Sequence, residues 1–108
     1  MIPLRERNCT PLQKGDPPLN NKQIAALKVQ LLTDWKVEGT TILKKSFEFE
    51  RFRRALAFVQ EIGILADQQN HHPDICIRYT RVDIELTTHD VNGLSENDFI
   101  MAAKIEDL

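Results

Sequence analysis

Apolar residues recur three or four positions apart in three stretches of the chain, which is the period of one face of an α-helix. Those positions are Ile24, Leu27 and Leu31, then Phe52, Ala55, Leu56, Val59, Ile62, Gly63 and Ala66, and finally Ala102, Ile105 and Leu108. We expect the first helix to begin at Asn20, whose side chain can cap it while Gln23 returns the bond. The second must end at or before His72, because a proline follows. The third is expected to begin at Ser95, with Asp98 closing a second capping box.

Between the first two helices the pattern alternates, as it does in a strand with one buried face. The apolar positions there are Trp35, Val37, Leu43, Phe47 and Phe49. Gly39 lies between the two runs and permits a turn, so the segment is predicted to be a β-hairpin.

In the segment after the second helix, the apolar residues change from odd-numbered to even-numbered positions. Its apolar positions are Ile75, Ile77 and Tyr79, followed by Val82, Ile84 and Leu86. One continuous strand cannot place both sets on one face, because side chains alternate with a period of two. A two-residue turn at Thr80-Arg81 resolves the conflict. The resulting pairs are Tyr79 with Val82, Ile77 with Ile84, and Ile75 with Leu86. The same register sets Arg78 opposite Asp83, a favourable charge pair.

The expected elements follow one another in the order α-β-β-α-β-β-α, without an internal repeat. Two hairpins beside amphipathic helices predict an α+β fold, in which three helices cover one face of a four-stranded antiparallel sheet. Four of the five prolines lie in residues 1–18, and proline resists helix formation, so this segment is expected to be an extended N-terminal arm. Residues 19–108 are expected to form a single domain.

Composition and charge exclude several classes of function. The chain has 108 residues, 42% of them hydrophobic, which suffices for one buried core. Its net charge is -2 and it has no long basic run, so it lacks the positive surface that binds nucleic acid. No apolar stretch is long enough for a membrane span or resembles a secretory signal. Cys9 and Cys76 are far apart and match no metal-binding spacing. We therefore expect a cytoplasmic protein that binds neither nucleic acid nor membrane.

All three histidines of the chain, His71, His72 and His89, are candidates for chemistry. The predicted hairpin register sets His89 opposite His72, beside the end of the second helix. Asp67 precedes His71 by one helical turn and is expected on the same face. Imidazole donates and accepts protons near neutral pH. The cluster therefore indicates general acid–base catalysis, with Asp67 fixing a tautomer or stabilising an imidazolium.

Other interpretations of these residues stay open. A single histidine near a helix end is often only a cap, and Ser95 and Asp98 are explained as a helix start. Three histidines and an aspartate could bind zinc, but adjacent His71 and His72 point in different directions on a regular backbone. No HExxH motif or cysteine spacing supports such a site either. A cysteine nucleophile is disfavoured because Cys76 lies within a predicted strand.

The spacing of these residues resembles the signature of one enzyme family. The signature positions are Asp67, His71-His72-Pro73, Tyr79, His89 and Asp98. The surrounding residues that agree with it are Thr87-Thr88-His89-Asp90, Gly93-Leu94-Ser95-Glu96 and the upstream Trp35. From Leu19 to Leu108 the chain is similar to the pterin-4a-carbinolamine dehydratases, whereas the arm lies outside the likeness.

This resemblance implies dehydration of a 4a-hydroxytetrahydropterin to the quinonoid dihydropterin, without a cofactor, in the recycling of pterin oxidised by an aromatic amino acid hydroxylase. It implies that His71 and His89 are the acid–base pair and that His72 binds and orients the pterin. The substrate-binding residues that it implies are Asp67, Asn70, His71, His72, Thr87, Thr88, His89 and Asp90. Asp98 matches the final acid of the signature. It is either a supporting acid of the site or only a helix cap. Some relatives carry an acid where Asn70 stands.

The resemblance also concerns assembly. Members of the family form dimers or dimers of dimers, and the edge strands of a small sheet invite pairing with another subunit. We therefore expect a homodimer or homotetramer. Animal members also bind a homeodomain transcription factor as a dimerisation cofactor, which supplies an alternative: a non-enzymatic oligomerising partner. The intact set of His71, His72 and His89 favours the enzyme.

Overall fold

Helices form where the helical period predicted them. The structure, a computed structural model, describes residues 2–108. Its α-helices are α1 at Asn21–Lys28, α2 at Phe52–Gln69 and α3 at Glu96–Glu106. Asn20 and Gln23 cap α1 reciprocally, with both bonds at 2.9 Å, which confirms the predicted start. The helix is shorter than predicted, so Leu31 packs against the core from the turn that follows it.

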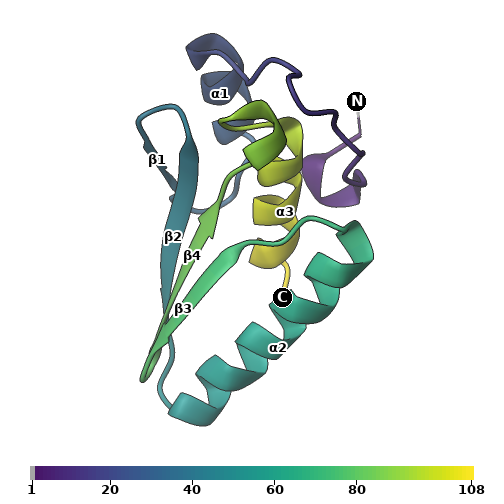
Figure 1. The fold of residues 1–108 in the computed structure, drawn as a ribbon. Helices are drawn as coiled ribbons and strands as arrows, with labels where there is room; N and C mark the ends of the chain where they lie inside the picture. The colour runs from purple at the N-terminus through teal and green to yellow at the C-terminus, as the bar shows by residue number, and fades with distance from the viewer. Residues whose placement is uncertain (1) are drawn as a thin grey trace.

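The strands form one antiparallel sheet and confirm the predicted α+β architecture. Their bounds are β1 Lys36–Glu38, β2 Ile42–Glu48, β3 Asp74–Arg78 and β4 Arg81–Leu86. The order across the sheet is β1-β2-β4-β3, so β1 and β3 are its edges. Figure 1 shows α2 and α3 on the same side of this sheet. On β4, Val82, Ile84 and Leu86 are buried while Arg81 and Glu85 are exposed, because successive side chains point to opposite faces.

The hairpin of β3 and β4 is present, but the register predicted for it was wrong. Its turn residues are Tyr79-Thr80, one position earlier than predicted. The observed pairs are Asp74 with Glu85, Ile75 with Ile84, Cys76 with Asp83, Ile77 with Val82, and Arg78 with Arg81. Each strand residue is thus displaced by two from its predicted partner. A shift of two keeps every side chain on its own face, so the buried face was predicted correctly although the pairs were not.

The exposure of Tyr79 explains the error. The apolar pattern assigns Tyr79 to the buried face, whereas it has a left-handed φ of 54° and is 76% exposed. Its ring stacks on Phe52 outside the sheet, with 6.3 Å between the ring centroids. The predicted contact of Arg78 with Asp83 survives as a diagonal one, with 3.3 Å between Nε and Oδ2.

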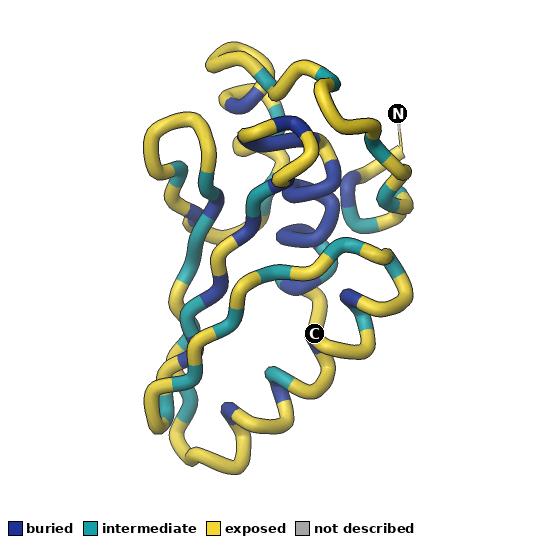
Figure 2. The backbone as a smooth tube through the Cα atoms, viewed as in Figure 1, coloured by how far each residue is buried: buried dark blue, intermediate teal, exposed yellow. Residues whose placement is uncertain are grey.

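Buried residues are concentrated in α3 and recur at alternate positions of β4 (Figure 2). The buried residues of α3 are Asn97, Asp98, Phe99, Ile100, Met101, Ala102, Ala103 and Ile105. A helix buried around most of its circumference must be covered on several sides. The sheet covers one side, and the N-terminal arm, described from residue 2 to residue 18, lies along another (Figure 1). Among the helices formed by residues 2–108, none combines the length and apolar character that a membrane span requires.

The N-terminal arm has one short 3-10 turn, η1 at Leu4–Glu6, and otherwise no regular element. Leu4 is only 3% exposed and belongs to the core. The contacts of the arm with α3 include Lys104 Nζ with the Arg5 carbonyl at 2.9 Å and Arg7 Nη1 with Glu96 Oε1 at 2.9 Å. The arm therefore runs from the end of α3 towards its start.

Candidate active site

The end of α2 sets the direction in which the first two histidines leave the helix. Asn70 ends α2 in the left-handed region, at φ 52° and ψ 41°, a conformation that asparagine tolerates better than most residues. The His71 N–H donates to the Ala66 carbonyl at 3.2 Å and closes a Schellman-type helix end. Asn70 therefore has a structural reason to be asparagine, and its contact with a pterin stays a prediction.

His71 meets a buried carboxylate at the start of α3. Its Nε2 lies 2.6 Å from Asp98 Oδ1, and the two side chains are 12% and 0% exposed. The other oxygen of Asp98 accepts the Thr88 hydroxyl at 2.8 Å and the Ser95 N–H at 3.0 Å. These donors offset the cost of burying the carboxylate. An imidazole that donates from Nε2 keeps its lone pair on Nδ1, which is the tautomer of a proton acceptor.

Asp67 contacts His72, and not His71 as the helical spacing predicted. His72 Nε2 lies 2.9 Å from Asp67 Oδ1, and the side chains are 58% and 82% exposed. The prediction assumed helical spacing as far as His71, but α2 ends at Gln69 and the left-handed Asn70 turns the chain. A contact this exposed contributes little to stability.

His89 lies beyond the sheet, and not opposite His72 as the predicted register required. The pairing of β3 with β4 begins at Asp74 with Glu85, so neither histidine belongs to the ladder. The two segments leave the sheet before they reach the histidines. The prediction that they meet across a continued hairpin was therefore wrong.

A closed loop after β4 presents His89 to solvent. The Thr88 N–H donates to the Gly93 carbonyl at 2.9 Å, so the 3-10 turn between them, η2 at His89–Val91, is held at both ends. Thr87 Oγ1 donates to the Thr41 carbonyl at 2.6 Å and ties the loop to the first hairpin. His89 is thus an exposed side chain on a constrained backbone.

Hydrogen bonds bring together residues from three separate segments. His71 and Thr88 both bind Asp98, and Thr88 immediately precedes His89, so the segments of the two histidines lie side by side at the start of α3. Ser95 Oγ, 2.7 Å from Thr88 Oγ1, joins the same network and was not among the predicted site residues. The sequence signalled Ser95 only as a helix cap and as a residue next to the family signature. The predicted site residues whose side chains do not join this network are Asp67, Asn70, His72, Thr87, His89 and Asp90.

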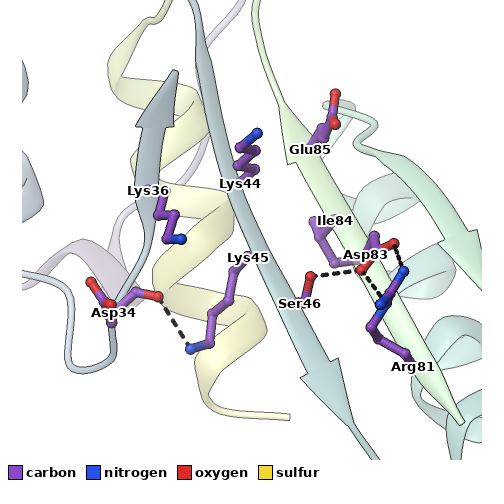
Figure 3. Close-up of a pocket in the computed structure, with 9 residues that line it drawn as sticks. All are labelled: Asp34, Lys36, Lys44, Lys45, Ser46, Arg81, Asp83, Ile84 and Glu85. Atoms are coloured by element: carbon purple, nitrogen blue, oxygen red, sulfur yellow. Dashed lines mark hydrogen bonds and ion pairs between the residues drawn. The ribbon is translucent and has the colours of Figure 1, made fainter. Parts of the chain in front are cut away.

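A hollow of about 600 Å³ lies on the sheet, and none of the candidate site residues line it (Figure 3). The residues lining that hollow are Asp34, Lys36, Lys44, Lys45, Ser46, Arg81, Asp83, Ile84 and Glu85. The Ser46 hydroxyl donates to Asp83 at 2.6 Å, and this bond, together with Arg81, lowers the pKa of the Asp83 carboxyl. Cations and anions alternate there and no histidine is present. Over residues 2–108, histidine, cysteine and acidic side chains form no group of three or more suited to a metal ion.

Comparison with known proteins places the chain in a family. The model of the family described as pterin 4 alpha carbinolamine dehydratase matches residues 17–108. A relative from Rubrobacter xylanophilus, which bears the name of a pterin-4-alpha-carbinolamine dehydratase, is 44% identical over 108 residues and covers 100% of both chains. A relative of the same name from Rickettsia canadensis is 42% identical over 106 residues, 98% of this chain and 97% of that protein. The likeness to these relatives thus extends into the arm, which the sequence interpretation left outside it.

Solved structures share the fold. The crystal structure of a transcriptional coactivator/pterin dehydratase from Brucella melitensis has a TM-score of 0.77 and 32% identity, and the match covers 83% of this chain and 96% of that one. A pterin dehydratase-like protein that is a RuBisCO assembly factor in the α-carboxysome has a TM-score of 0.61 and 24% identity, over 70% of this chain and 89% of that one, and shows the fold alone. The matched family model and the full-length relatives show that this chain belongs to the pterin-4-alpha-carbinolamine dehydratase family, a family of hydro-lyases.

Proposed function

We propose that this protein dehydrates a 4a-hydroxytetrahydropterin to the quinonoid dihydropterin by acid–base catalysis, without a metal or other cofactor. The observation that carries the proposal is the chain of contacts from His71 through Asp98 to Thr88, next to His89. It supplies one imidazole held by a buried carboxylate and a second imidazole on a constrained loop. Membership of the family supports the same reaction.

The proposed reaction requires two proton transfers at neighbouring atoms of the pterin ring. The C4a–O bond breaks as the hydroxyl takes a proton from a general acid and leaves as water. A general base takes the proton of the adjacent ring nitrogen, whose electron pair forms the new C=N bond. One proton is given and one is removed, so the protein ends with its original proton count. His71 and His89 are the proposed pair.

The other residues are proposed to support this pair. Asp98 holds the Nε2–H of His71 and stabilises the imidazolium that forms when Nδ1 takes up a proton. His72 is exposed and contacts Asp67 only at the surface, which suits it to bind and orient the pterin. The remaining residues proposed to line the pocket are Asn70, Thr87, Thr88 and Asp90.

We further propose that the substrate comes from an aromatic amino acid hydroxylase, that the protein acts in the cytoplasm, and that it works as a homo-oligomer. The alternative is a non-enzymatic oligomerising role, since one structural neighbour is described as a transcriptional coactivator and another as an assembly factor. The contact between His71 and Asp98 favours the enzyme, because assembly alone does not require an imidazole held by a buried carboxylate.

A dehydration assay on the purified protein tests the proposal. Formation of the quinonoid product is followed by absorbance, with the uncatalysed rate subtracted. We expect a rate proportional to protein concentration and unchanged by dialysis against a chelator. The matched control is the double variant His71→Ala with His89→Ala. A native rate equal to that of buffer would refute the enzyme, and a chelator-induced loss restored specifically by zinc would refute metal-free chemistry.

A further inference from the structure

The N-terminal arm contacts the end of α2 immediately before the first site histidine. The Cys9 N–H donates to Gln69 Oε1 at 2.8 Å, and Gln69 Nε2 donates to Asn8 Oδ1 at 3.2 Å. Gln69 is the last residue of α2 and stands two positions before His71. Its amide therefore fixes the point at which the chain leaves the helix.

The next residue of the arm is bound by the start of α3. The Thr10 N–H donates to Asn97 Oδ1 at 3.0 Å, and Asn97 Nδ2 donates to the Thr10 carbonyl at 2.8 Å. Asn97 is only 7% exposed, and it immediately precedes Asp98 in the chain. Consecutive residues of the arm, Cys9 and Thr10, thus join the end of α2 to the start of α3.

A later part of the arm holds the loop that carries His89. The Gly15 N–H donates to the Asp90 carbonyl at 3.0 Å, within η2. Pro18 packs so closely on Gly93 that a Cβ atom there would lie 2.9 Å from the proline Cβ. The arm therefore touches all three segments from which the candidate site is built.

We propose that Gln69 and Asn97 are positioning residues, and that the arm holds them so that His71 and Asp98 stay in contact. The inference rests on the proposed function for its catalytic consequence. Helix ends fray unless their backbone and side chains are held. The bond between His71 and Asp98 joins two such ends, and displacements of about 1 Å in a catalytic group can cost on the order of 10²-fold in rate. The match to the family model begins at residue 17, so it includes Gln69 and Asn97 but not the arm residues that they bind.

Most of these bonds use backbone groups of the arm, namely the Cys9 N–H and both the N–H and the carbonyl of Thr10. Two side chains of the arm add to them: Asn8 Oδ1 accepts from Gln69, and Cys9 Sγ lies 3.6 Å from the Asn97 carbonyl. An amide side chain that binds the N–H and the carbonyl of one residue, as Asn97 binds Thr10, fixes the backbone there without requiring a particular side chain. For this reason the contacts of the arm with Gln69 and Asn97 leave no sequence motif in the arm. The specific positions are those of the two amides, Gln69 and Asn97.

Gln69→Ala tests the clamp, and Gln68→Ala is its matched control. Both changes remove a glutamine side chain from the last turn of α2, but Gln68 is exposed and makes none of the contacts with the arm. Gln69→Glu is the conservative variant, because its carboxylate still accepts the Cys9 N–H. The first readout is the imidazole ¹H–¹⁵N spectrum of His71 over a pH titration, without substrate. The second is the split of dehydration kinetics into kcat and KM.

We expect Gln69→Ala to change the tautomer signature and titration of His71 and to lower kcat about tenfold with KM little changed. Gln68→Ala is expected to match the native protein within about twofold. Gln69→Glu is expected to restore most of the kcat and to shift the His71 spectrum less than Gln69→Ala does, because it loses only the bond to Asn8. Equal His71 spectra in the two alanine variants would overturn the inference, whether or not the protein is active. If Gln69→Ala does not fold, Gln69→Glu against Gln68→Glu decides the question by the same spectrum, since loss of the bond to Asn8 alone should give a partial shift. A native protein without dehydratase activity would refute the proposed function and leave the spectroscopic test intact.

Discussion

The two oxygens of Asp98 serve different purposes. Oδ2 accepts the Ser95 N–H and the Thr88 hydroxyl, which fixes the carboxylate in the first turn of α3. A helix start also favours a negative charge. Oδ1 is thereby aimed at His71. The roles of helix cap and supporting acid are therefore compatible, because the cap sets the orientation in which the acid meets the imidazole.

Replacing the proposed acid–base pair should reduce turnover more than affinity. His71→Ala and His89→Ala are each expected to lower kcat by about 10²–10⁴-fold with a modest change in KM, because general acid–base catalysis acts in the transition state. His72→Ala should chiefly raise KM. The losses at His71 and His89 should not multiply in the double variant if the residues act as a unit. Steady-state kinetics corrected for the uncatalysed reaction measure all four variants. Near-normal kcat in both single variants would remove the assignment, even if the protein still bound pterin.

The cysteines should differ sharply in reactivity. Burial, followed by the negative charge of Asp98, raises the pKa of the Cys9 thiol to about 11, whereas Cys76 is exposed. The thiolate is the reactive form, so at pH 8 a thiol reagent should label Cys76 rapidly and Cys9 only after unfolding. Mass spectrometry of the labelled protein, with Cys76→Ser as the control, measures this. Because the unfolded Cys9 ionises first, stability should also fall as the pH rises from about 9 towards 11. Rapid labelling of Cys9 in the folded protein would contradict the partial burial of its thiol.

At the scale of elements, local sequence signals predicted the helices, the hairpins and their buried faces. They did not predict the strand register, which depends on contacts between residues far apart in the chain. The capping residues Asn20 and Ser95 were readable because the partners lie three positions away in the chain. The parity of apolar residues gave the buried face of each hairpin. The register of β3 with β4 was not readable, because Tyr79 is aromatic but packs outside the sheet. Periodicity cannot distinguish a core aromatic from one that stacks on a neighbouring helix.

The candidate site was predictable in its residues and not in its contacts. Their clustering in the sequence selected the three histidines and Asp67, and the resemblance to the family added Asp98. The partner of His71 lies 27 positions away, so no helical or strand period could identify it. The left-handed Asn70 breaks the period at the point where Asp67 would meet His71. The contacts of the arm with Gln69 were not predictable either, because they join residues 60 and 61 positions apart and one of them uses only the backbone N–H of Cys9.

The left-handed backbone conformation of Asn70 at the end of α2 can be tested by substitution. An alanine in the left-handed region pays for its Cβ, whereas glycine does not, so Asn70→Ala should be less stable than the native protein by about 1 kcal/mol. Asn70→Gly should be close to native. Urea unfolding at constant slope measures both differences. Equal midpoints for the alanine and glycine variants would show that the left-handed cap does not persist in solution.

At the scale of the whole molecule, β3 is an edge strand whose residues would pair favourably with those of a second, antiparallel β3. The five residues Asp74–Arg78 are paired on one side only, by β4. If two copies pair antiparallel about Cys76, Asp74 of each stands opposite Arg78 of the other on the face away from the helices. The same register sets Ile75 opposite Ile77 on the face that the helices cover. Opposite charges and apolar pairs directly across a ladder both favour pairing.

This symmetry yields a prediction for the proposed homo-oligomer that a charge exchange can decide. Light scattering should give a mass that is a multiple of 12.5 kDa at micromolar concentration. Asp74→Arg or Arg78→Asp alone places like charges across the interface and should weaken association, while the double variant restores opposite pairs and should restore it. Arg78 also contacts Asp83 in its own chain, so the double variant is the decisive one.

Mild oxidation should join two Cys76 residues, because opposite positions in an antiparallel pair lie about 4.5–5.5 Å apart between Cα atoms, within disulfide range. A native monomer, or a double variant that stays dissociated while folded, would show that this edge is not where two copies meet.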